Sequence, residues 1–360
     1  MPTRHPTVYL HIGPPKTGTT YLQDVLWRNR KRLSRLDIAL PDRSPTAHFQ
    51  AALDLRAMEF AGHHDRAVRG AWQRLVAKCQ SAGSDKVIIT HELFAGASQE
   101  QIERVAADLA PAPIHVIYGA RDVARQLPAV WQETLKNRRT SSFRQFLSTT
   151  LKVDQSGRRT GGFWQAHDPV EVLNRWGCVV RPNRIHVVTL PQRGAPPSTL
   201  WARFCEAVEM PPGGFDLEVA RSNSSLTAPY AEVLRRLNTV LPAGLPWPSY
   251  ERLVKNRFSE YADTADTMAA GEPLVVPEQD HATVMQIATE MRGGLAAAGY
   301  HIVGDLGDLI PPDSAFGRMI KPSPDKVIEA AVQLLSDALT ADDGGLRVRA
   351  VAWAHAIRRR

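Results

Sequence analysis

Lys16 lies in a short loop where glycines and threonines surround its positive charge. Residues 8–26 read VYLHIGPPKTGTTYLQDVL. Alternating apolar side chains over 8–12 predict a strand, and the apolar spacing after residue 20 predicts a helix. Loop amides at a helix N-terminus, the helix dipole and one lysine together favour a bound anion. The stretch therefore predicts a cradle for a phosphate or a phosphate-like ester.

The spacing within this loop argues against two common nucleotide sites. A P-loop carries lysine directly after its last glycine, whereas Lys16 comes two residues before Gly18. The G-x-G-x-x-G fingerprint of dinucleotide sites is absent from the sequence. The order Pro15-Lys16-Thr17-Gly18-Thr19-Thr20 instead resembles the 5′-phosphosulfate loop of the sulfotransferase family. The resemblance implies that these residues bind 3′-phosphoadenosine 5′-phosphosulfate (PAPS) and that no metal is needed. It also implies that Lys16 stabilises the phosphate oxygen that leaves.

A basic residue follows the strand predicted over 114–118. In sulfotransferases the corresponding strand ends in an arginine, and a serine eight residues later completes the site for the 3′-phosphate. Arg121 fits this pattern, because a guanidinium holds phosphate oxygens in a bidentate fork. Ala129 occupies the position of the serine, so the hydroxyl of the family is missing. The candidates to replace it are Ser141, Ser142, Arg125, Lys255, Asn256 and Arg257.

Two titratable residues follow the strand predicted over 86–90. Sulfuryl transfer to a hydroxyl needs a base that takes the proton of the acceptor, and His91 and Glu92 both stand where this base is expected. Sulfotransferases that act on small molecules commonly use a histidine near this point, and several that act on carbohydrates use a glutamate. Consecutive side chains point apart, so we expect only one of the two to face the donor. We favour Glu92, with His91 second.

Strands and helical patterns alternate along the first half of the chain. The pattern predicts strands at 8–12, 86–90, 114–118 and 184–190, with helices over 46–60, 65–82, 99–108 and 122–136. This alternation predicts an α/β fold whose doubly wound parallel sheet is flanked by helices. Ligands of such sheets bind at the carboxyl ends of the strands, which is where the loop, Glu92 and Arg121 all fall.

The second half of the chain is mostly helical, with helices predicted over 198–208, 228–241 and 279–298. Extra C-terminal helices are predicted over 325–339 and 347–357, after a proline-rich stretch at 311–324. We therefore predict a sulfotransferase-like domain over 1–310 and a linker over 311–324. A helical extension over 325–360 is expected to pack on or beside the core.

Composition narrows the class of protein. The chain has 360 residues, of which 43% are hydrophobic and 22% charged, as in globular proteins. Its net charge of +7 suits an anionic ligand, but much of it lies in 28–35 and 358–360, so we expect a solvated basic face and no nucleic-acid partner. The three cysteines form no metal pattern. No apolar run predicts a membrane span or a signal peptide, so we expect a cytoplasmic protein.

Together these observations predict a PAPS-dependent sulfotransferase that acts on a hydroxyl of a small-molecule, carbohydrate or lipid acceptor. Two alternatives stay open at this point. One is a kinase-like nucleotide phosphotransferase with an atypical phosphate loop. The other is a non-catalytic PAPS-binding relative, which the absence of a hydroxyl at Ala129 keeps in view.

Overall fold

The computed structural model describes residues 5–59, 65–218, 225–262, 274–319 and 321–341. The chain divides into two compact units, each discontinuous in sequence. Unit 1 consists of Met1–Trp131, Phe143–Ser222 and Val275–Arg318, and unit 2 of Gln132–Ser142, Asn223–Leu274 and Met319–Arg360. These boundaries differ from the predicted division at 310 and 324.

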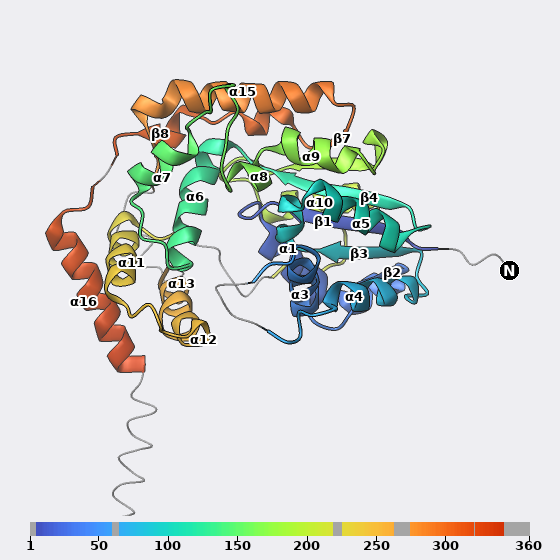
Figure 1. Ribbon diagram of the computed structural model, residues 1–360, viewed down its shortest axis with the longest axis horizontal. Coiled ribbons are helices and arrows are strands. Elements are labelled where there is room, and N and C mark those ends of the chain that lie inside the picture. Colours follow the sequence, from blue (N-terminus) through green and yellow to red (C-terminus); the bar gives the residue numbers. More distant parts are fainter. Residues whose placement is uncertain (1–4, 60–64, 219–224, 263–273, 320, 342–360) are drawn as a thin grey trace, which may run out of the picture. The chain divides into compact units, whose positions relative to one another are not determined.

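Unit 1 is built on a six-stranded parallel sheet with the order β2-β3-β1-β4-β5-β7 (Figure 1). Its strands are β1 (Thr7–Gly13), β2 (Ile38–Ala39), β3 (Lys86–Thr90), β4 (Ile114–Ala120), β5 (Ile185–Thr189) and β7 (His301–Val303). The α/β fold with a parallel sheet is confirmed. Strand β1 lies between β3 and β4: after β1 the chain forms β2 and β3 on one side of it, and then β4, β5 and β7 on the other. The carboxyl end of β1 is therefore the switch point where such sheets bind ligands.

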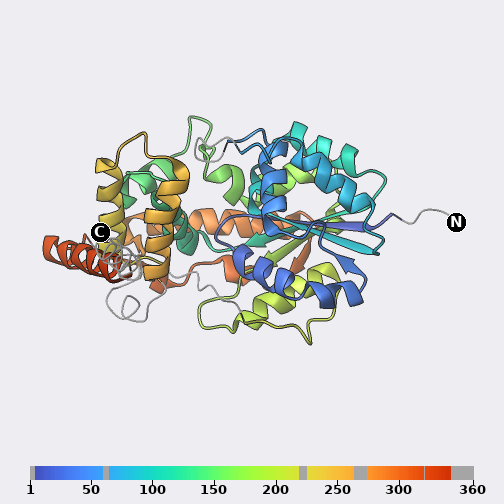
Figure 2. The same cartoon turned by 90° about the horizontal axis from the view of Figure 1, so that it is seen from below.

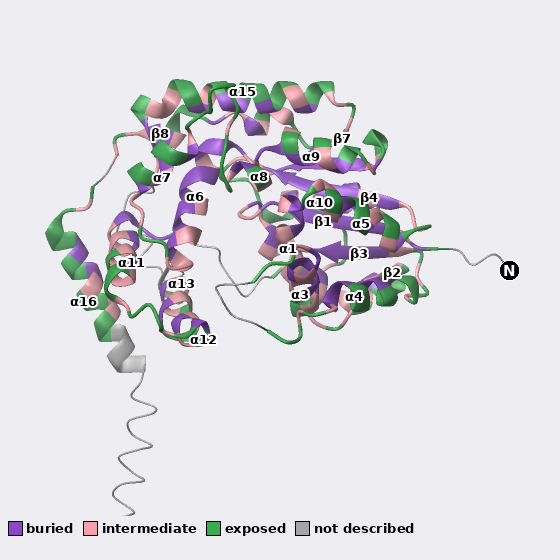
Figure 3. Cartoon of the chain, viewed as in Figure 1, coloured by how far each residue is buried: buried purple, intermediate pink, exposed green. Residues whose placement is uncertain are grey.

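Helices cover both faces of this sheet, as Figure 2 shows from below. One face packs on α3 (Pro45–Leu55), α4 (Ala71–Gln80), α5 (Gln99–Leu109) and α9 (Pro169–Gly177). The other face packs on α1 (Thr19–Arg28), α2 (Arg30–Arg35) and α10 (Pro197–Val208). Because both faces are covered, the central strands are buried along their length (Figure 3). Such strands are apolar in continuous runs rather than in alternation.

Further elements complete unit 1. The helices are α7 (Phe143–Thr150), α8 (Trp164–His167) and α15 (His281–Ala297), and the tight helical turns are η1 (Glu92–Gly96), η2 (Pro182–Arg184), η4 (Glu278–Asp280), η5 (Leu306–Leu309) and η6 (Asp313–Ala315). Strands β6 (Val276–Pro277) and β8 (Phe316–Gly317) form a separate parallel pair. Because β8 is paired, the stretch 311–324 contains ordered pairing where the sequence predicted only a linker.

Every secondary-structure element described in unit 2 is helical. It contains α11 (Ala228–Val240), α12 (Trp247–Tyr250), η3 (Glu251–Lys255), α13 (Asn256–Ala262) and α16 (Pro324–Ala341). It also contains the end of α6 (Val123–Lys136), whose first part belongs to unit 1. Arg138 lies over the ring of Tyr250, with its guanidinium carbon 4.4 Å from the ring centroid. The Tyr250 hydroxyl donates to Asn238 at 2.8 Å. Tyr250 of α12 thus contacts both Arg138, just after α6, and Asn238 of α11.

The differences between predicted and observed elements have physical causes. The strands β2 and β7, with 2 and 3 residues, were not predicted because runs this short carry no periodicity. Helix α16 matches the helix predicted over 325–339. The helix predicted over 347–357 lies outside the described residues.

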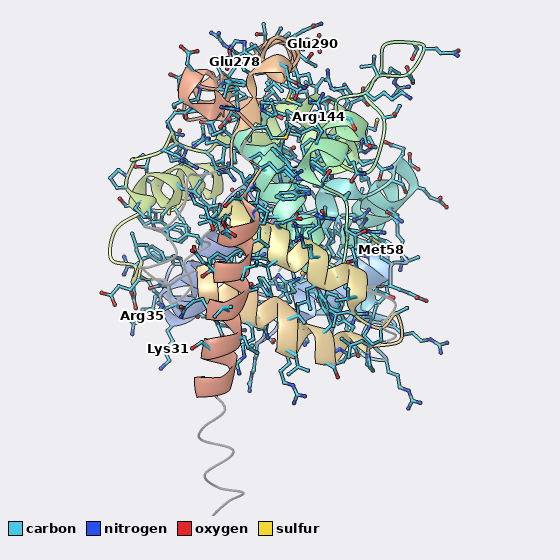
Figure 4. The ribbon with its side chains drawn as sticks, turned by 90° about the vertical axis from the view of Figure 1, so that its left-hand side faces the viewer. Lys31, Arg35, Met58, Arg144, Glu278 and Glu290 are labelled. Atoms are coloured by element: carbon cyan, nitrogen blue, oxygen red, sulfur yellow. The ribbon has the colours of Figure 1, made fainter. Side chains whose placement is uncertain are left out.

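The basic segment 28–35 is only partly paired. Arg28 forms an ion pair with Asp216 at 3.1 Å, and Arg32 donates to the carbonyl of Gly213 at 2.7 Å. Lys31 and Arg35 are exposed, and Figure 4 shows their side chains pointing outward. An exposed basic face at α2 agrees with the solvated surface that the sequence predicted.

Three histidines are buried in and beside the sheet and stay neutral: His11 in β1, His48 in α3 and His186 in β5. His11 and His48, which are 1% and 0% exposed, both bind Thr90: His11 Nδ1 lies 2.8 Å from its hydroxyl, and its amide donates to His48 Nδ1 at 3.1 Å. His186 lies 2.9 Å from His115, nitrogen to nitrogen. Burial lowers the pKa of each of the three imidazoles to about 4, with a smaller contribution from the nearby His115 and His301 in the case of His186.

These imidazoles make the fold sensitive to mild acid. The folded pKa of about 4 lies below the unfolded value of about 6.5. Below pH 6.5 the unfolded chain binds protons at these imidazoles and the folded chain does not. The unfolding free energy is therefore unaffected by them above pH 6.5 and falls as the pH drops from 6.5 toward 4. We predict that each of these imidazoles lowers the unfolding free energy by about 2 kcal/mol at pH 5 relative to pH 7. Urea unfolding at the two pH values measures this loss.

The matched variant is His11→Gln. It should be less stable than the wild type at pH 7, because a buried contact with Thr90 is changed, but it should lose about 2 kcal/mol less between pH 7 and pH 5. If both proteins lose the same free energy, His11 is protonated as easily in the folded chain as in the unfolded one.

Candidate functional site

The loop that follows β1 turns tightly into α1. Lys16 has φ 66° and Gly18 has φ 76°, both in the left-handed region. Helix α1 begins at Thr19, directly after Gly18, and Thr20 is its second residue. The first amides of a helix have no partner within it, so the N-terminus of α1 offers donors to an anion. The predicted strand, loop and helix are thus all present in the expected order.

Side chains from three places hold the carbonyl side of the loop. Three consecutive carbonyl groups each accept a hydrogen bond: Pro14 from the Thr17 hydroxyl at 2.6 Å, Pro15 from Gln126 Nε2 at 2.5 Å, and Lys16 from Arg121 Nη1 at 2.8 Å. Because these acceptors are already satisfied, the loop is fixed from its carbonyl side. The sequence predicted the Thr17 hydroxyl as a donor to the ligand, but in the structure its proton is used within the loop.

Glu92 lies against the loop. It is the first residue of η1, directly after His91 at the end of β3. The backbone passes so close that a Cβ added to Gly13 would lie 2.6 Å from the Cα of Glu92, and Gly13 also has φ +91°. The Thr19 hydroxyl donates to Glu92 Oε2 at 2.5 Å. The pairing of β3 with β1 therefore brings this carboxylate beside the loop, as expected if the two strands were neighbours.

His91 faces a different environment. Its Nδ1 accepts a hydrogen bond from the Leu93 amide at 3.2 Å, so it caps the N-terminus of η1. Its ring packs on Phe49, with the centroids 5.2 Å apart. Burial, with smaller contributions from the nearby His48 and His11, lowers the pKa of His91 to about 3. With its acceptor nitrogen already engaged, His91 is poorly arranged to take a proton from a substrate.

Two arginines fix the turn that carries Glu92. Arg56 Nη1 donates to the carbonyl of Leu93 at 3.1 Å. Arg175 donates to the carbonyl of Ala97 at 3.2 Å and to that of Ala95 at 3.1 Å. Burial lowers the pKa of both guanidinium groups, and for Arg56 the charge of Arg175 lowers it further. The C-terminal carbonyls of η1 are therefore bound by cations, which suits the dipole of a helical turn.

Arg121 stands at the carboxyl end of β4. Burial, with a smaller contribution from Arg125 that Asp122 opposes, lowers its pKa to about 10. It therefore stays charged at neutral pH. Asp122 is 1% exposed and forms its ion pair with Arg125, whose amide it also binds at 2.9 Å. Asp122 thus caps the start of α6 and neutralises Arg125 instead of Arg121.

Some residues singled out in the sequence belong to unit 2. Lys255 forms an ion pair with Glu133 at 3.2 Å, within unit 2. Ser141, Ser142, Asn256 and Arg257 also belong to unit 2. Within the described ranges, no group of three or more histidine, cysteine or acidic side chains is arranged to hold a metal ion. None of the helices described is both long and apolar enough to cross a membrane.

The sequence did not predict several residues that shape this site. Gln126 lies in the first turn of α6, five residues after Arg121. Gly119 is the second-last residue of β4. A Cβ on Gly119 would lie 2.8 Å from the Thr17 hydroxyl oxygen. A small residue at a strand end beside a ligand loop was the available signal for Gly119. No local pattern marks Arg56 or Arg175, because their roles depend on tertiary contacts.

Comparison with solved structures finds a loose similarity. No family model and no curated protein matches this chain. The crystal structure of a sulfotransferase from Alicyclobacillus acidocaldarius aligns with 60% of this chain and 86% of its own, at 16% sequence identity and a TM-score of 0.38. A similarity of this size does not decide the function. We therefore argue the function from the residues of the site.

The close approach of Gly119 to Thr17 generates a prediction. Gly119→Ala places a methyl group where the Thr17 side chain lies, so the loop has to shift. We expect the unfolding free energy to fall by about 1–3 kcal/mol, as in other overpacked sites. Urea unfolding measures it.

Gly293→Ala is the matched control. Gly293 is exposed within α15, with no atom within 4 Å of an added Cβ. This change should raise the unfolding free energy by up to about 1 kcal/mol, because alanine favours the helix. Equal stability of Gly119→Ala and the wild type would show that the loop adjusts freely.

Proposed function

We propose that this chain is a sulfotransferase that moves the sulfuryl group of PAPS to a hydroxyl of a small-molecule, carbohydrate or lipid acceptor. The observation that carries the proposal is the meeting of an anion cradle and a carboxylate, joined by the 2.5 Å hydrogen bond between Thr19 and Glu92. A cradle alone suits many phosphate ligands. A carboxylate beside it supplies the base that transfer to a hydroxyl requires.

The loop is suited to the 5′-phosphosulfate end of this donor. Its carbonyls are bound by Thr17, Gln126 and Arg121, which leaves the amide side and the N-terminus of α1 for an anion. Lys16 adds a full positive charge within the loop. The sequence motif, which resembles the phosphosulfate loop of sulfotransferases, supports the same assignment.

Arg121 is proposed to bind the 3′-phosphate of the donor. It stays charged at neutral pH and follows β4, the strand beside β1. The two anionic groups of the donor would then each meet a cation at the switch point of the sheet. Ala129 leaves this second subsite without the hydroxyl found in the family.

In the proposed reaction Glu92 takes the proton of the acceptor hydroxyl as that oxygen attacks sulfur in line. Lys16 balances the charge that develops on the bridging oxygen as the bond to sulfur breaks. Both groups are held by the backbone before any ligand arrives, Glu92 by η1 and Lys16 by the fixed loop. Such preorganised charge, with correct positioning, accounts for most of the acceleration in reactions of this kind.

One prediction of the proposed function tests the identity of the donor. We expect 3′-phosphoadenosine 5′-phosphate (PAP) to bind at least about tenfold more tightly than AMP, because charge-assisted bonds from an arginine to phosphate contribute about 1.5–3 kcal/mol. Isothermal calorimetry measures both affinities. In Arg121→Met this preference should largely disappear. Tighter binding of ATP with Mg²⁺ than of PAP would instead favour a nucleotide phosphotransferase.

The second prediction tests the base. Glu92→Gln keeps the size of the side chain and removes its proton acceptor, so we expect turnover to fall by about 10²–10⁴-fold. Binding of PAP should change little. Release of PAP in the presence of a panel of hydroxyl acceptors measures the rate.

His91→Asn is the matched control, because asparagine also caps the N-terminus of a helical turn. We expect it to keep most of the activity. If His91→Asn is inactive while Glu92→Gln turns over normally, the base is His91. If both stay active, neither residue takes the proton.

A further inference from the structure

The hydrogen bond between Thr19 and Glu92 connects the two halves of the candidate site. Thr19 is 3% exposed and is the first residue of α1. Its hydroxyl donates to Glu92 Oε2 at 2.5 Å, across 73 positions of the chain. Bonds from a hydroxyl to an ionised carboxylate are among the shortest and strongest that proteins make. Thr19 therefore holds the proposed base while it also belongs to the proposed donor loop.

The chemistry of a hydroxyl limits what Thr19 can do at one time. A threonine hydroxyl has one proton and so donates one hydrogen bond. Glu92 as a carboxylate only accepts, and so does an anion in the cradle. Thr19 can therefore donate to Glu92 or to the donor, but not to both.

We propose that Thr19 transfers its hydrogen bond from Glu92 to the donor when the donor binds, and that this exchange readies Glu92 as the base. The inference rests on the proposed function. A turn of the Thr19 side chain between staggered rotamers is sufficient. The bond from Oγ1–H to Oε2 of Glu92 breaks and a bond from Oγ1–H to a phosphosulfate oxygen forms. No proton leaves Thr19 in this step.

The exchange changes what Glu92 can accept. A carboxylate that accepts a hydrogen bond holds its charge more firmly and takes a proton less readily. Once Oε2 has lost the bond from Thr19, it can accept the hydroxyl of the acceptor. In the transfer step the acceptor O–H bond breaks and its oxygen bonds to sulfur. The bond from sulfur to the bridging oxygen breaks, and the proton ends on Glu92. The base is thus strongest only when the donor is in place.

The test follows the ionisation of Glu92 in the whole chain. The carboxyl carbons of glutamate are labelled with ¹³C, and the signal of Glu92 is assigned by its loss in Glu92→Gln. Titrations are recorded for the wild type, Thr19→Val and Thr19→Ser, each with and without PAP. Valine matches threonine in shape and lacks the hydroxyl, whereas serine keeps it. Thr19→Ala is the second variant if Thr19→Val does not fold.

We expect the titration midpoint of Glu92 in free Thr19→Val to lie about 0.5–1 pH unit above that of the wild type, the shift that one lost hydrogen bond produces. With PAP bound, the two midpoints should coincide, because Thr19 no longer donates a hydrogen bond to Glu92. Any effect of the charge of PAP on Glu92 is common to both proteins and cancels. Thr19→Ser should follow the wild type in both states.

Other results overturn the inference, and they do so in distinguishable ways. A midpoint difference that persists with PAP bound shows that Thr19 stays on Glu92, which overturns the exchange and leaves the proposed function intact. No difference in the free proteins shows that the bond has no effect on the base. Failure of the wild type to bind PAP in calorimetry overturns the proposed function and the exchange together.

Discussion

Crowding of the backbone at the carboxyl ends of three neighbouring strands is the constraint on which the candidate site depends. Gly13 at the end of β1 has no room for a methyl group beside Glu92, and Gly119 in β4 has none beside Thr17. Parallel pairing sets these distances, because β3 and β4 lie on either side of β1. The same closeness lets a side chain from the β4 end, Arg121, reach a loop carbonyl and lets Thr19 reach Glu92.

The electrostatics of the region separate a charged edge from a neutral interior. Lys16 and Arg121 place positive charge at the edge, and Asp122 does not offset it because it is paired with Arg125. Deeper in unit 1, burial keeps the imidazoles of His11, in β1, and His48, in α3, uncharged at neutral pH. A positive edge over a neutral layer attracts an anion without stabilising a second negative charge inside. Proton exchange with a substrate is then confined to groups at the edge itself.

Much of this arrangement was predictable from sequence, and the remainder depends on tertiary contacts. The central strands were predictable because short stretches rich in apolar side chains, alternating over 8–12, stand between helical patterns. The position of Lys16 between β1 and α1 was predictable because strand, loop and helix are local in sequence. The sequence placed His91 and Glu92 together but could not show which of them caps η1, since that depends on backbone angles. Gln126 and Arg56 act through carbonyls more than 30 positions away, and no local pattern encodes such bonds.

The support of the loop by distant side chains has a consequence for how chains of this kind are recognised. The six residues from Pro15 to Thr20 do not set their own shape, because the carbonyls of Pro15 and Lys16 are held by residues more than 100 positions later in the chain. Grafting the hexapeptide between a strand and a helix of another scaffold would transfer its sequence without its backbone conformation. A search pattern with better discrimination would be discontinuous. It would require the loop together with a glycine two positions before the arginine that follows β4, and a glutamine five positions after that arginine.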